Sequence, residues 1–174
     1  MSKSVVHRFE RPQRIRFSHC DPAGIVFFPQ YMVMFNALLE DWFTEGMGLD
    51  YAAMVAQRRI GTPTVSLQCD FTAISRMGDD VTLGLSVLRI GGASFQLSVG
   101  CRHGDEPRVR MTQALVITNL DTHRPVQLPD DVRAASRAYA AGLYDEGLAA
   151  RAASDPALAL RRFSDAVALD GRLT

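Results

Sequence analysis

Residues 20–31 read Cys20-Asp21-Pro22-Ala23-Gly24-Ile25-Val26-Phe27-Phe28-Pro29-Gln30-Tyr31, and this stretch introduces the helix around which the fold is predicted to form. Asp21, Pro22 and Gly24 predict a turn. Pro29 suits the first turn of a helix, because its missing N–H would have no helical partner there. Residues 30–45 predict a helix that is buried on more than one side, because apolar residues recur at helical spacing, at Tyr31, Phe35, Leu38, Leu39 and Trp42.

Alternation with a period of two, before and after this helix, predicts strands. One short strand is predicted over residues 14–17, just ahead of the motif. A single buried helix followed by antiparallel strands is an α+β pattern, so we expect a long central helix wrapped by an antiparallel sheet. Beyond a short helix around residues 51–57, the predicted strands cover residues 65–71, 81–87, 95–101 and 109–118, with turns at Gly91-Gly92 and at residues 104–107.

The character of the chain changes at Asp131, where alanine becomes frequent and the strand signals stop. Two helical stretches follow, and the second begins with Ser154 or Asp155 as its N-cap and Pro156 in its first turn. We therefore expect one domain over residues 1–130 and a C-terminal helical extension over residues 131–174. The extension is expected to pack on that domain or on a partner subunit.

The composition limits the classes of partner and the location. The 174 residues include 19 Lys plus Arg and 19 Asp plus Glu, and this net charge of zero gives no reason to expect nucleic acid as a partner. No apolar run has the length of a signal peptide or of a bilayer-spanning helix, so no membrane association is expected. The three cysteines are odd in number and far apart, which favours a reducing, cytoplasmic location. Together with the four histidines they show no metal-ligand spacing, so no metal site is expected.

Residues 18–21 place a hydroxyl, an imidazole, a thiol and a carboxylate in a row. A Ser-His-Asp triad is not expected, because adjacent strand residues point to opposite faces, whereas the members of a triad converge from separated positions. Two interpretations of Asp21 stay open. An aspartate before a proline is often only a turn former. Alternatively, the apolar residues 25–28 partly desolvate this carboxylate and make it reactive, and the N–H groups at the following helix start can stabilise an oxyanion.

The motif from Cys20 to Pro29, followed by Tyr31 and an aromatic-rich helix, closely resembles the signature of the 4-hydroxybenzoyl-CoA thioesterase family. A second motif, Gly61-Thr62-Pro63-Thr64-Val65-Ser66, resembles the stretch in which that family begins its second strand. The likeness covers roughly residues 13–120 and keeps the same order of helix, short helix and strands. It implies the hotdog fold and an enzyme that hydrolyses acyl-CoA thioesters.

The resemblance also implies catalytic roles. Asp21 would act as nucleophile or general base toward the thioester carbonyl, and the backbone N–H of Phe28 would polarise that carbonyl. Members of the family place the site between two subunits, so Gly61 and Thr62 of the partner subunit would line it, which implies a homodimer or homotetramer. The family needs no metal and no redox cofactor, and coenzyme A is part of the substrate.

Further residues are expected to bind the substrate. Pro29 and Tyr31, at the helix start, would shape the acyl pocket. Asn36 stands where the 4-hydroxybenzoyl-specific enzyme carries an acidic residue that faces this pocket. Arg89 and Ser94 flank the turn where that enzyme holds the coenzyme A phosphates with basic residues. Other candidates for the phosphate contact are Arg58, Arg59 and Arg76.

The predicted function is hydrolysis of an aromatic, 4-hydroxybenzoyl-like acyl-CoA thioester, or of a short- or medium-chain one. Two alternatives stay open. A hotdog-fold hydratase or dehydratase usually needs an Asp/His pair, and no histidine lies between Cys20 and Leu67. A non-catalytic acyl-binding or scaffolding protein would use the C-terminal helices as its interaction element.

Overall fold

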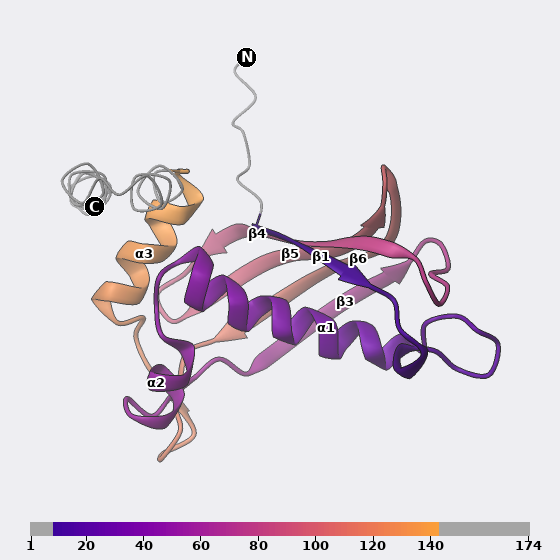
Figure 1. Cartoon of the computed structure of the whole chain (residues 1–174). Helices are drawn as coiled ribbons and strands as arrows, with labels where there is room; N and C mark the ends of the chain where they lie inside the picture. The colour runs from indigo at the N-terminus through magenta and orange to yellow at the C-terminus, as the bar shows by residue number, and fades with distance from the viewer. Residues whose placement is uncertain (1–8, 143–174) are drawn as a thin grey trace.

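The computed structural model describes residues 9–142, and its main elements are one long helix and a five-stranded antiparallel sheet (Figure 1). Helix α1 spans Phe28–Asp41 and continues through a π-helical turn, Trp42–Gly46. The strands lie in the order β1-β4-β5-β6-β3, with every neighbouring pair antiparallel. Their bounds are Phe9–Arg14 for β1, Thr64–Phe71 for β3, Asp80–Ile90 for β4, Ser94–His103 for β5 and Glu106–Val116 for β6.

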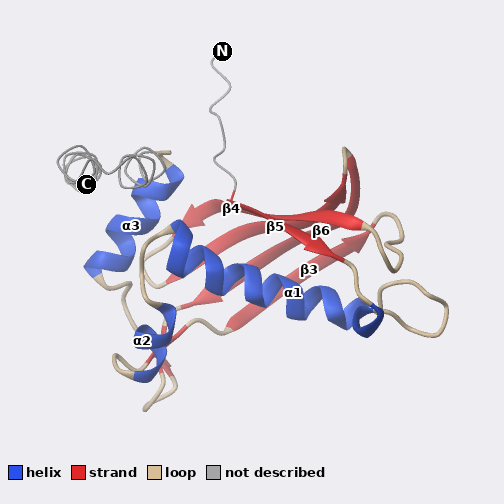
Figure 2. Ribbon diagram, viewed as in Figure 1, coloured by secondary structure: helices blue, strands red, loops and turns tan. Residues whose placement is uncertain are grey.

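The shorter elements lie around the two ends of α1. Figure 2 shows α2 and α3 near the end of the sheet where α1 finishes, whereas the loop that leads into α1 lies at the opposite end. No helix within residues 9–142 is long and apolar enough to cross a membrane. These elements are a 3-10 turn at Phe17–His19, α2 at Tyr51–Ala56, α3 at Asp130–Ala140, and a small sheet of β2 (Ile60–Gly61), β7 (Thr118–Asn119) and β8 (Arg124–Pro125).

The core fills the space between α1 and one face of the sheet. Leu38 and Leu39 of the helix are buried, as are Leu83 of β4 and Leu97 of β5. Each such side chain contributes about 1.5–3 kcal/mol when it leaves water, which is why the apolar stripe of α1 and the alternate residues of the strands face one another. The predicted architecture, a long central helix wrapped by an antiparallel sheet, is confirmed.

The strand predicted over residues 14–17 is wrong in position. Strand β1 occupies Phe9–Arg14 instead, and residues 17–19 form a 3-10 turn. Pro12 lies inside β1, opposite Thr82 of β4. A proline is tolerated there because β1 is the edge strand on this side of the sheet, where a missing N–H leaves no ladder hydrogen bond unmade.

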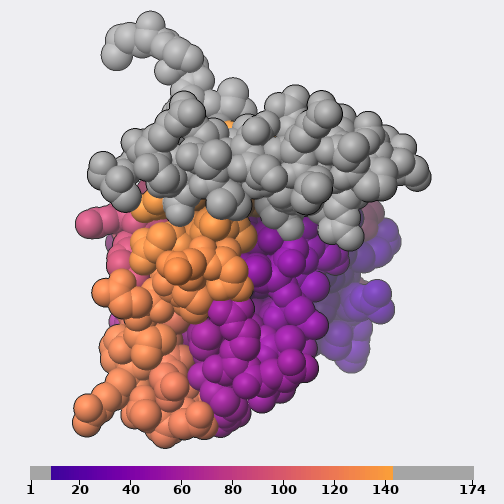
Figure 3. All heavy atoms as spheres, turned by 90° about the vertical axis from the view of Figure 1, so that its left-hand side faces the viewer, coloured from indigo at the N-terminus to yellow at the C-terminus, as the bar shows by residue number. Residues whose placement is uncertain are grey.

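Helix α3 packs on the core. Val132 and Tyr139 are buried, and the Tyr139 ring lies 5.7 Å from the ring of Trp42. At the start of the helix, Asp131 accepts two hydrogen bonds from Arg58, at 2.7 and 2.9 Å. Figure 3 shows the orange segment that contains α3 lying against the purple segment that contains the end of α1. The domain division at residue 130 stays a prediction, and the helix predicted from Ser154 lies outside the described residues.

Strand β3 forms the other edge of the sheet, and its apolar row is largely uncovered. Val65 is 62 % exposed and Phe71 is 50 % exposed, and Leu67 between them is exposed as well. An edge strand also presents unpaired N–H and C=O groups that can bond to another strand. The side of the molecule where α1 lies next to β3 therefore offers both apolar surface and free backbone groups.

Candidate active site

The segment from His19 to Phe27 forms a narrow loop with Asp21 on one arm. The N–H of Asp21 donates to the carbonyl of Ile25 at 3.0 Å, and the N–H of Phe27 donates to the carbonyl of His19 at 3.0 Å. Gly24 turns the chain with a φ of +75°, a conformation that favours glycine. The geometry of this loop thus fixes the backbone on both sides of the Asp21 carboxylate.

The Asp21 side chain is half-buried and does two things at once. Its Oδ1 accepts the N–H of Ala23 at 2.9 Å, so the residue is the turn former that its position before Pro22 predicts. Its Oδ2 has no protein hydrogen-bond partner within residues 9–142. One carboxylate oxygen therefore anchors the turn while the other stays available to a substrate or a water molecule.

Backbone hydrogen bonds from the connection between β3 and β4 hold this loop in place. The N–H of Val26 donates to the carbonyl of Ser75 at 3.0 Å, Ile25 forms an isolated antiparallel bridge with Arg76, and Met77 donates to the carbonyl of Gly24 at 3.4 Å. No periodicity or motif in the sequence pointed to Ser75, because the contact is made by backbone atoms and depends on the three-dimensional course of the chain.

Helix α1 begins at Phe28 with a free backbone donor. The preceding residue, Phe27, provides no side-chain cap, and Pro29 occupies the second helical position. The first N–H groups of a helix have no partner inside it, and in the described part of the chain no acceptor is found for the N–H of Phe28. The Phe28 ring is exposed and lies 6.2 Å from the ring of Phe71 on β3.

Tyr31 lies behind the start of α1, and its side chain is buried. Its side chain is only 3 % exposed, with the ring 5.9 Å from Phe71 and 6.1 Å from Phe35. Burial raises the pKa of the Tyr31 hydroxyl, and the nearby hydroxyl of Ser75 offsets part of that rise. The two hydroxyls approach each other without good hydrogen-bond geometry, and neither has another partner among the described residues. The expected role of Tyr31 in substrate binding stays a prediction.

A cavity of about 220 Å³ lies farther along α1, between this helix and strands β3 and β6. Asn36 lines it, and its amide donates to Glu40 at 2.8 Å. Gln113 lines it as well and donates to the hydroxyl of Thr64 at 2.6 Å. Sequence reasoning found Asn36 and missed Gln113, although a glutamine among the apolar residues of a central strand is a signal. The remaining lining residues are Met32, Phe35, Leu67 and Met111.

Gly61 and Thr62 lie near α2, where both are buried within this chain. A methyl group on Gly61 would come within 2.6 Å of a Leu120 side-chain carbon, so only glycine fits without movement of that leucine. The hydroxyl of Thr62 lies 3.1 Å from the hydroxyl of Tyr51. These contacts position the start of β3, and the predicted contact of both residues with a substrate stays a prediction.

Arg89 and Ser94 share a second cavity, of about 350 Å³, around the Gly91-Gly92 turn. Arg133 of α3 holds this turn through hydrogen bonds to the carbonyls of Gly91 and Gly92. Figure 1 shows α3 and the start of α1 at opposite ends of the sheet. One copy of the chain therefore does not bring Arg89 and Ser94 to Asp21.

The other arginines proposed for the phosphate contact differ in what they bind. Arg58 donates to Asp131, and the Nε of Arg59 donates to Asp121 at 2.9 Å. The side chain of Arg76 is exposed, and its backbone N–H donates to Asp79 at 2.9 Å. Two of the three guanidinium groups are thus already engaged in ion pairs.

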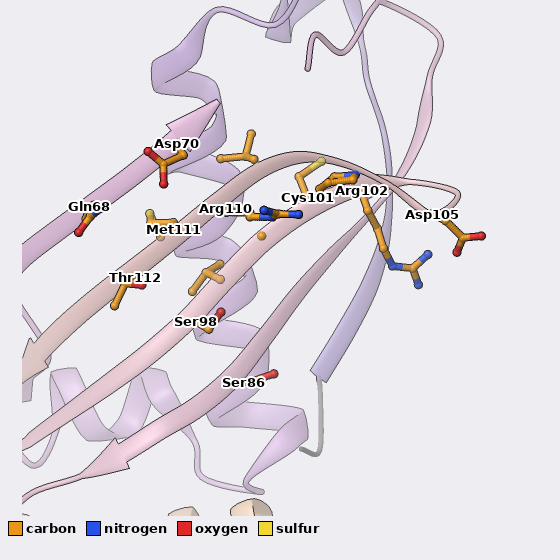
Figure 4. Close-up of a pocket in the computed structure, with 14 residues that line it drawn as sticks. Gln68, Asp70, Ser86, Ser98, Cys101, Arg102, Asp105, Arg110, Met111 and Thr112 are labelled. Carbon is orange, nitrogen blue, oxygen red and sulfur yellow. The ribbon is translucent and has the colours of Figure 1, made fainter. Parts of the chain in front are cut away.

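A further cavity, of about 560 Å³, lies on the sheet face that points away from α1. Figure 4 shows its polar lining, with Gln68 and Asp70 on β3, Arg110 and Thr112 on β6, and Ser98 on β5. None of the residues that the sequence predicted for the site lines this cavity. Across residues 9–142, no cluster of three His, Cys, Asp or Glu side chains is arranged to hold a metal ion.

Comparisons with known proteins identify the family of this chain. The sequence profile described as the Thioesterase-like superfamily matches residues 15–136. The chain is similar to a 4-hydroxybenzoyl-CoA thioesterase of Pseudomonas sp. (strain CBS-3), with 36 % identity over 72 residues, which is 41 % of this chain and 51 % of that protein. The match thus spans about half the length of that curated relative. The predicted resemblance is confirmed.

Solved structures share the fold. A 1,4-dihydroxy-2-naphthoyl-CoA thioesterase from Synechocystis aligns with a TM-score of 0.67 at 20 % identity, over 74 % of this chain and 95 % of its own. A gentisyl-coenzyme A thioesterase aligns with a TM-score of 0.66 at 25 % identity, over 72 % and 99 %. A Staphylococcus aureus protein solved in complex with CoA aligns with a TM-score of 0.69 at 15 % identity, over 79 % and 87 %. The predicted hotdog fold is confirmed by these alignments.

Proposed function

Because this chain belongs to the Thioesterase-like superfamily, we propose that it is an acyl-CoA thioesterase in which Asp21 drives hydrolysis. One observation carries the proposal. Within residues 9–142, a carboxylate oxygen of Asp21 and the helix-start N–H of Phe28 both lack a protein hydrogen-bond partner, and the two groups lie on one continuous segment. Acyl transfer needs both groups, one to attack or to activate water and the other to stabilise the developing oxyanion.

The proposed reaction uses these two groups in sequence. The thioester carbonyl oxygen accepts the N–H of Phe28, where the positive end of the α1 dipole favours a developing negative charge. In one route the Asp21 carboxylate attacks the carbonyl carbon, the C–S bond breaks and coenzyme A leaves as a thiolate, after which water hydrolyses the acyl anhydride. In the other route Asp21 accepts a proton from water while the water oxygen forms the new C–O bond, after which the tetrahedral intermediate collapses, the C–S bond breaks and coenzyme A leaves as a thiolate. Neither route needs a metal or redox cofactor.

The complete site is proposed to lie between two copies of the chain, in a homodimer or a dimer of dimers. The exposed apolar row of β3, with Val65 and Phe71, supports this arrangement, as do the unpaired backbone groups of that edge strand. The separation of Asp21 from the cavity with Arg89 and Ser94 supports it as well. A second copy would supply Arg89 and Ser94 as the contact for the coenzyme A phosphates.

The acyl group is proposed to be small, either an aromatic ring of the 4-hydroxybenzoyl type or a short to medium chain. The cavity beside Asn36 measures about 220 Å³, which is below the range of about 300–1,000 Å³ that is typical for drug-sized ligands. The similar proteins named above as thioesterases of 4-hydroxybenzoyl-CoA and gentisyl-CoA favour the aromatic class. The free thiols of Cys20, Cys69 and Cys101 are in keeping with the proposed cytoplasmic location.

A thiol-release assay over a panel of acyl-CoA thioesters tests the proposed function. The panel contains aromatic, short-chain, medium-chain and long-chain members, with release of free coenzyme A followed by a thiol reagent. We expect turnover of aromatic and shorter members and little turnover of long chains. Absence of turnover across the whole panel would overturn the proposal and favour a non-catalytic acyl-binding role.

A further inference from the structure

Gln113 interrupts an apolar row on the inner face of β6. Val109, Met111 and Leu115 of the same row are buried in the core. Gln113 itself is half-buried. An amide that leaves water without full hydrogen bonding costs about 1–3 kcal/mol, so the part of this side chain that is removed from water needs polar partners. The amide of Gln113 makes one hydrogen bond among the described residues, to the hydroxyl of Thr64 at 2.6 Å. Its carbonyl oxygen and second N–H have no hydrogen-bond partner within residues 9–142 and can bond to a ligand.

The partner has room in the cavity of about 220 Å³ that Gln113, Thr64 and Asn36 line. The other lining residues are apolar, and no ionised side chain is among them. Such a cavity accepts an apolar ring or chain and offers amide and hydroxyl groups to a neutral oxygen substituent. A charged substituent would have no counter-ion there and would be disfavoured by desolvation.

The cavity lies farther along α1, toward its C-terminus, than the position proposed for the reacting carbonyl at Phe28. Asn36 follows Phe28 by eight residues in α1, which at about 1.5 Å per residue separates their Cα atoms by about 12 Å. Side chains on a helix lean toward its N-terminus, so the cavity lining reaches back toward Phe28. Strand β3 runs beside the helix over the same interval, with Leu67 at the cavity and Phe71 against the Phe28 ring.

We propose that Gln113, held by Thr64, is a specificity-determining residue that hydrogen-bonds a neutral oxygen on the acyl group at the end remote from the thioester. The inference rests on the proposed function, because it assumes that the carbonyl of the same acyl group sits at Phe28. Among the proposed acyl groups, the inference favours those that carry an uncharged hydroxyl at the end remote from the thioester.

Two thioether analogues that cannot be hydrolysed test the inference by binding alone. 4-Hydroxyphenacyl-CoA carries the far hydroxyl, and phenacyl-CoA lacks it. Calorimetry gives their dissociation constants for the wild type, for Gln113→Leu and for the control Gln68→Leu, which changes an exposed glutamine on β3 opposite Thr112. We expect the wild type and the control to prefer the hydroxylated analogue by about 5- to 10-fold, the effect of one neutral hydrogen bond, and Gln113→Leu to bind both within about 2-fold.

Two results would overturn the assignment: no preference in the wild type, or an unchanged preference in Gln113→Leu, including an equal loss of affinity for both analogues. If Gln113→Leu fails to fold, as judged by its circular dichroism and melting temperature, Thr64→Val tests the same contact and is expected to lower the preference. The analogues report binding without turnover, so the two claims are tested separately. Absence of thiol release across the panel would overturn the proposed function. The preference between the two analogues would still test the role of Gln113.

Discussion

The guanidinium Nη2 of Arg133 lies 2.9 Å from the carbonyl oxygen of Gly92, and this contact ties α3 to the turn between β4 and β5. The backbone N–H of Leu128, just ahead of the helix, donates to the same oxygen at 2.8 Å. Arg89 and Ser94 flank this turn and share its cavity. If the turn holds the coenzyme A phosphates as proposed, α3 determines how well the phosphate contact is preorganised.

Replacing Arg133 with methionine should therefore weaken the contact with the nucleotide part of the substrate. We expect KM for an acyl-CoA to rise by about 3- to 10-fold, the effect of one or two lost hydrogen bonds, while kcat changes little. The matching N-acetylcysteamine thioester lacks the nucleotide, so its kcat/KM should stay the same. Steady-state kinetics with both substrates make the comparison.

Arg124→Met, which removes an exposed arginine on β8, is the control and should resemble the wild type. Arg133→Lys should recover part of the lost affinity. An equal loss on both substrates for Arg133→Met would show that the residue supports the fold in general and would contradict a role in positioning the turn.

A charge on the β3 edge should separate the proposed dimer. Val65 is largely exposed and does not line the acyl cavity, so Val65→Glu would bring two like charges together across an interface in which β3 meets its copy. We expect analytical ultracentrifugation to show a monomer and the thiol-release assay to show a loss of activity of about 100-fold, because the phosphate contact would be missing. Val33→Glu, on α1 and exposed to the same 62 % as Val65, is the matched control. A monomeric wild type with full activity would contradict the shared site.

The ion pair between Arg58 and Asp131 should make stability depend on acidic pH. Hydrogen bonding to Arg58 lowers the pKa of Asp131 below its usual 3.8. A lowered pKa in the folded state means that the stabilisation is fully present above pH 3.8 and is lost as the pH falls through the lower, folded value. The side chains are 39 % and 52 % exposed, so solvent screening limits the contribution to about 0–1 kcal/mol.

Urea denaturation of the wild type and Asp131→Asn at several pH values measures this contribution. The difference in free energy of unfolding should be largest near neutral pH and should shrink toward zero in acid. Asp105→Asn, in the exposed turn between β5 and β6, should show no such difference. A difference that grows as the pH is lowered would contradict the assigned sign.

Much of the fold could be predicted from periodicity alone. The apolar stripe of residues 30–45 gave α1 because a helix repeats every 3.6 residues, and strict alternation gave β3, β4 and β5. Strand β1 was misplaced because its alternation is interrupted by Pro12, and only the sheet order shows that this strand lies at an edge where a proline is allowed.

The site could be predicted where it is continuous in sequence. Asp21 and Phe28 belong to one motif, and their loop and helix start are local structures. Gln113, Ser75 and Arg133 could not be found in that way, because their partners Thr64, Val26 and Gly92 are distant in the chain and meet them only in the folded protein.

The most direct test of the central claim compares Asp21→Asn with the wild type on the best substrate of the panel. The amide keeps the size of the side chain and can still accept the N–H of Ala23, so the loop should fold as before. We expect kcat to fall by about 100- to 10,000-fold, the usual contribution of a catalytic acid or base, with binding of the phenacyl thioether unchanged. Wild-type turnover by Asp21→Asn, with the same affinity for the thioether, would contradict the assignment of Asp21 as the catalytic carboxylate.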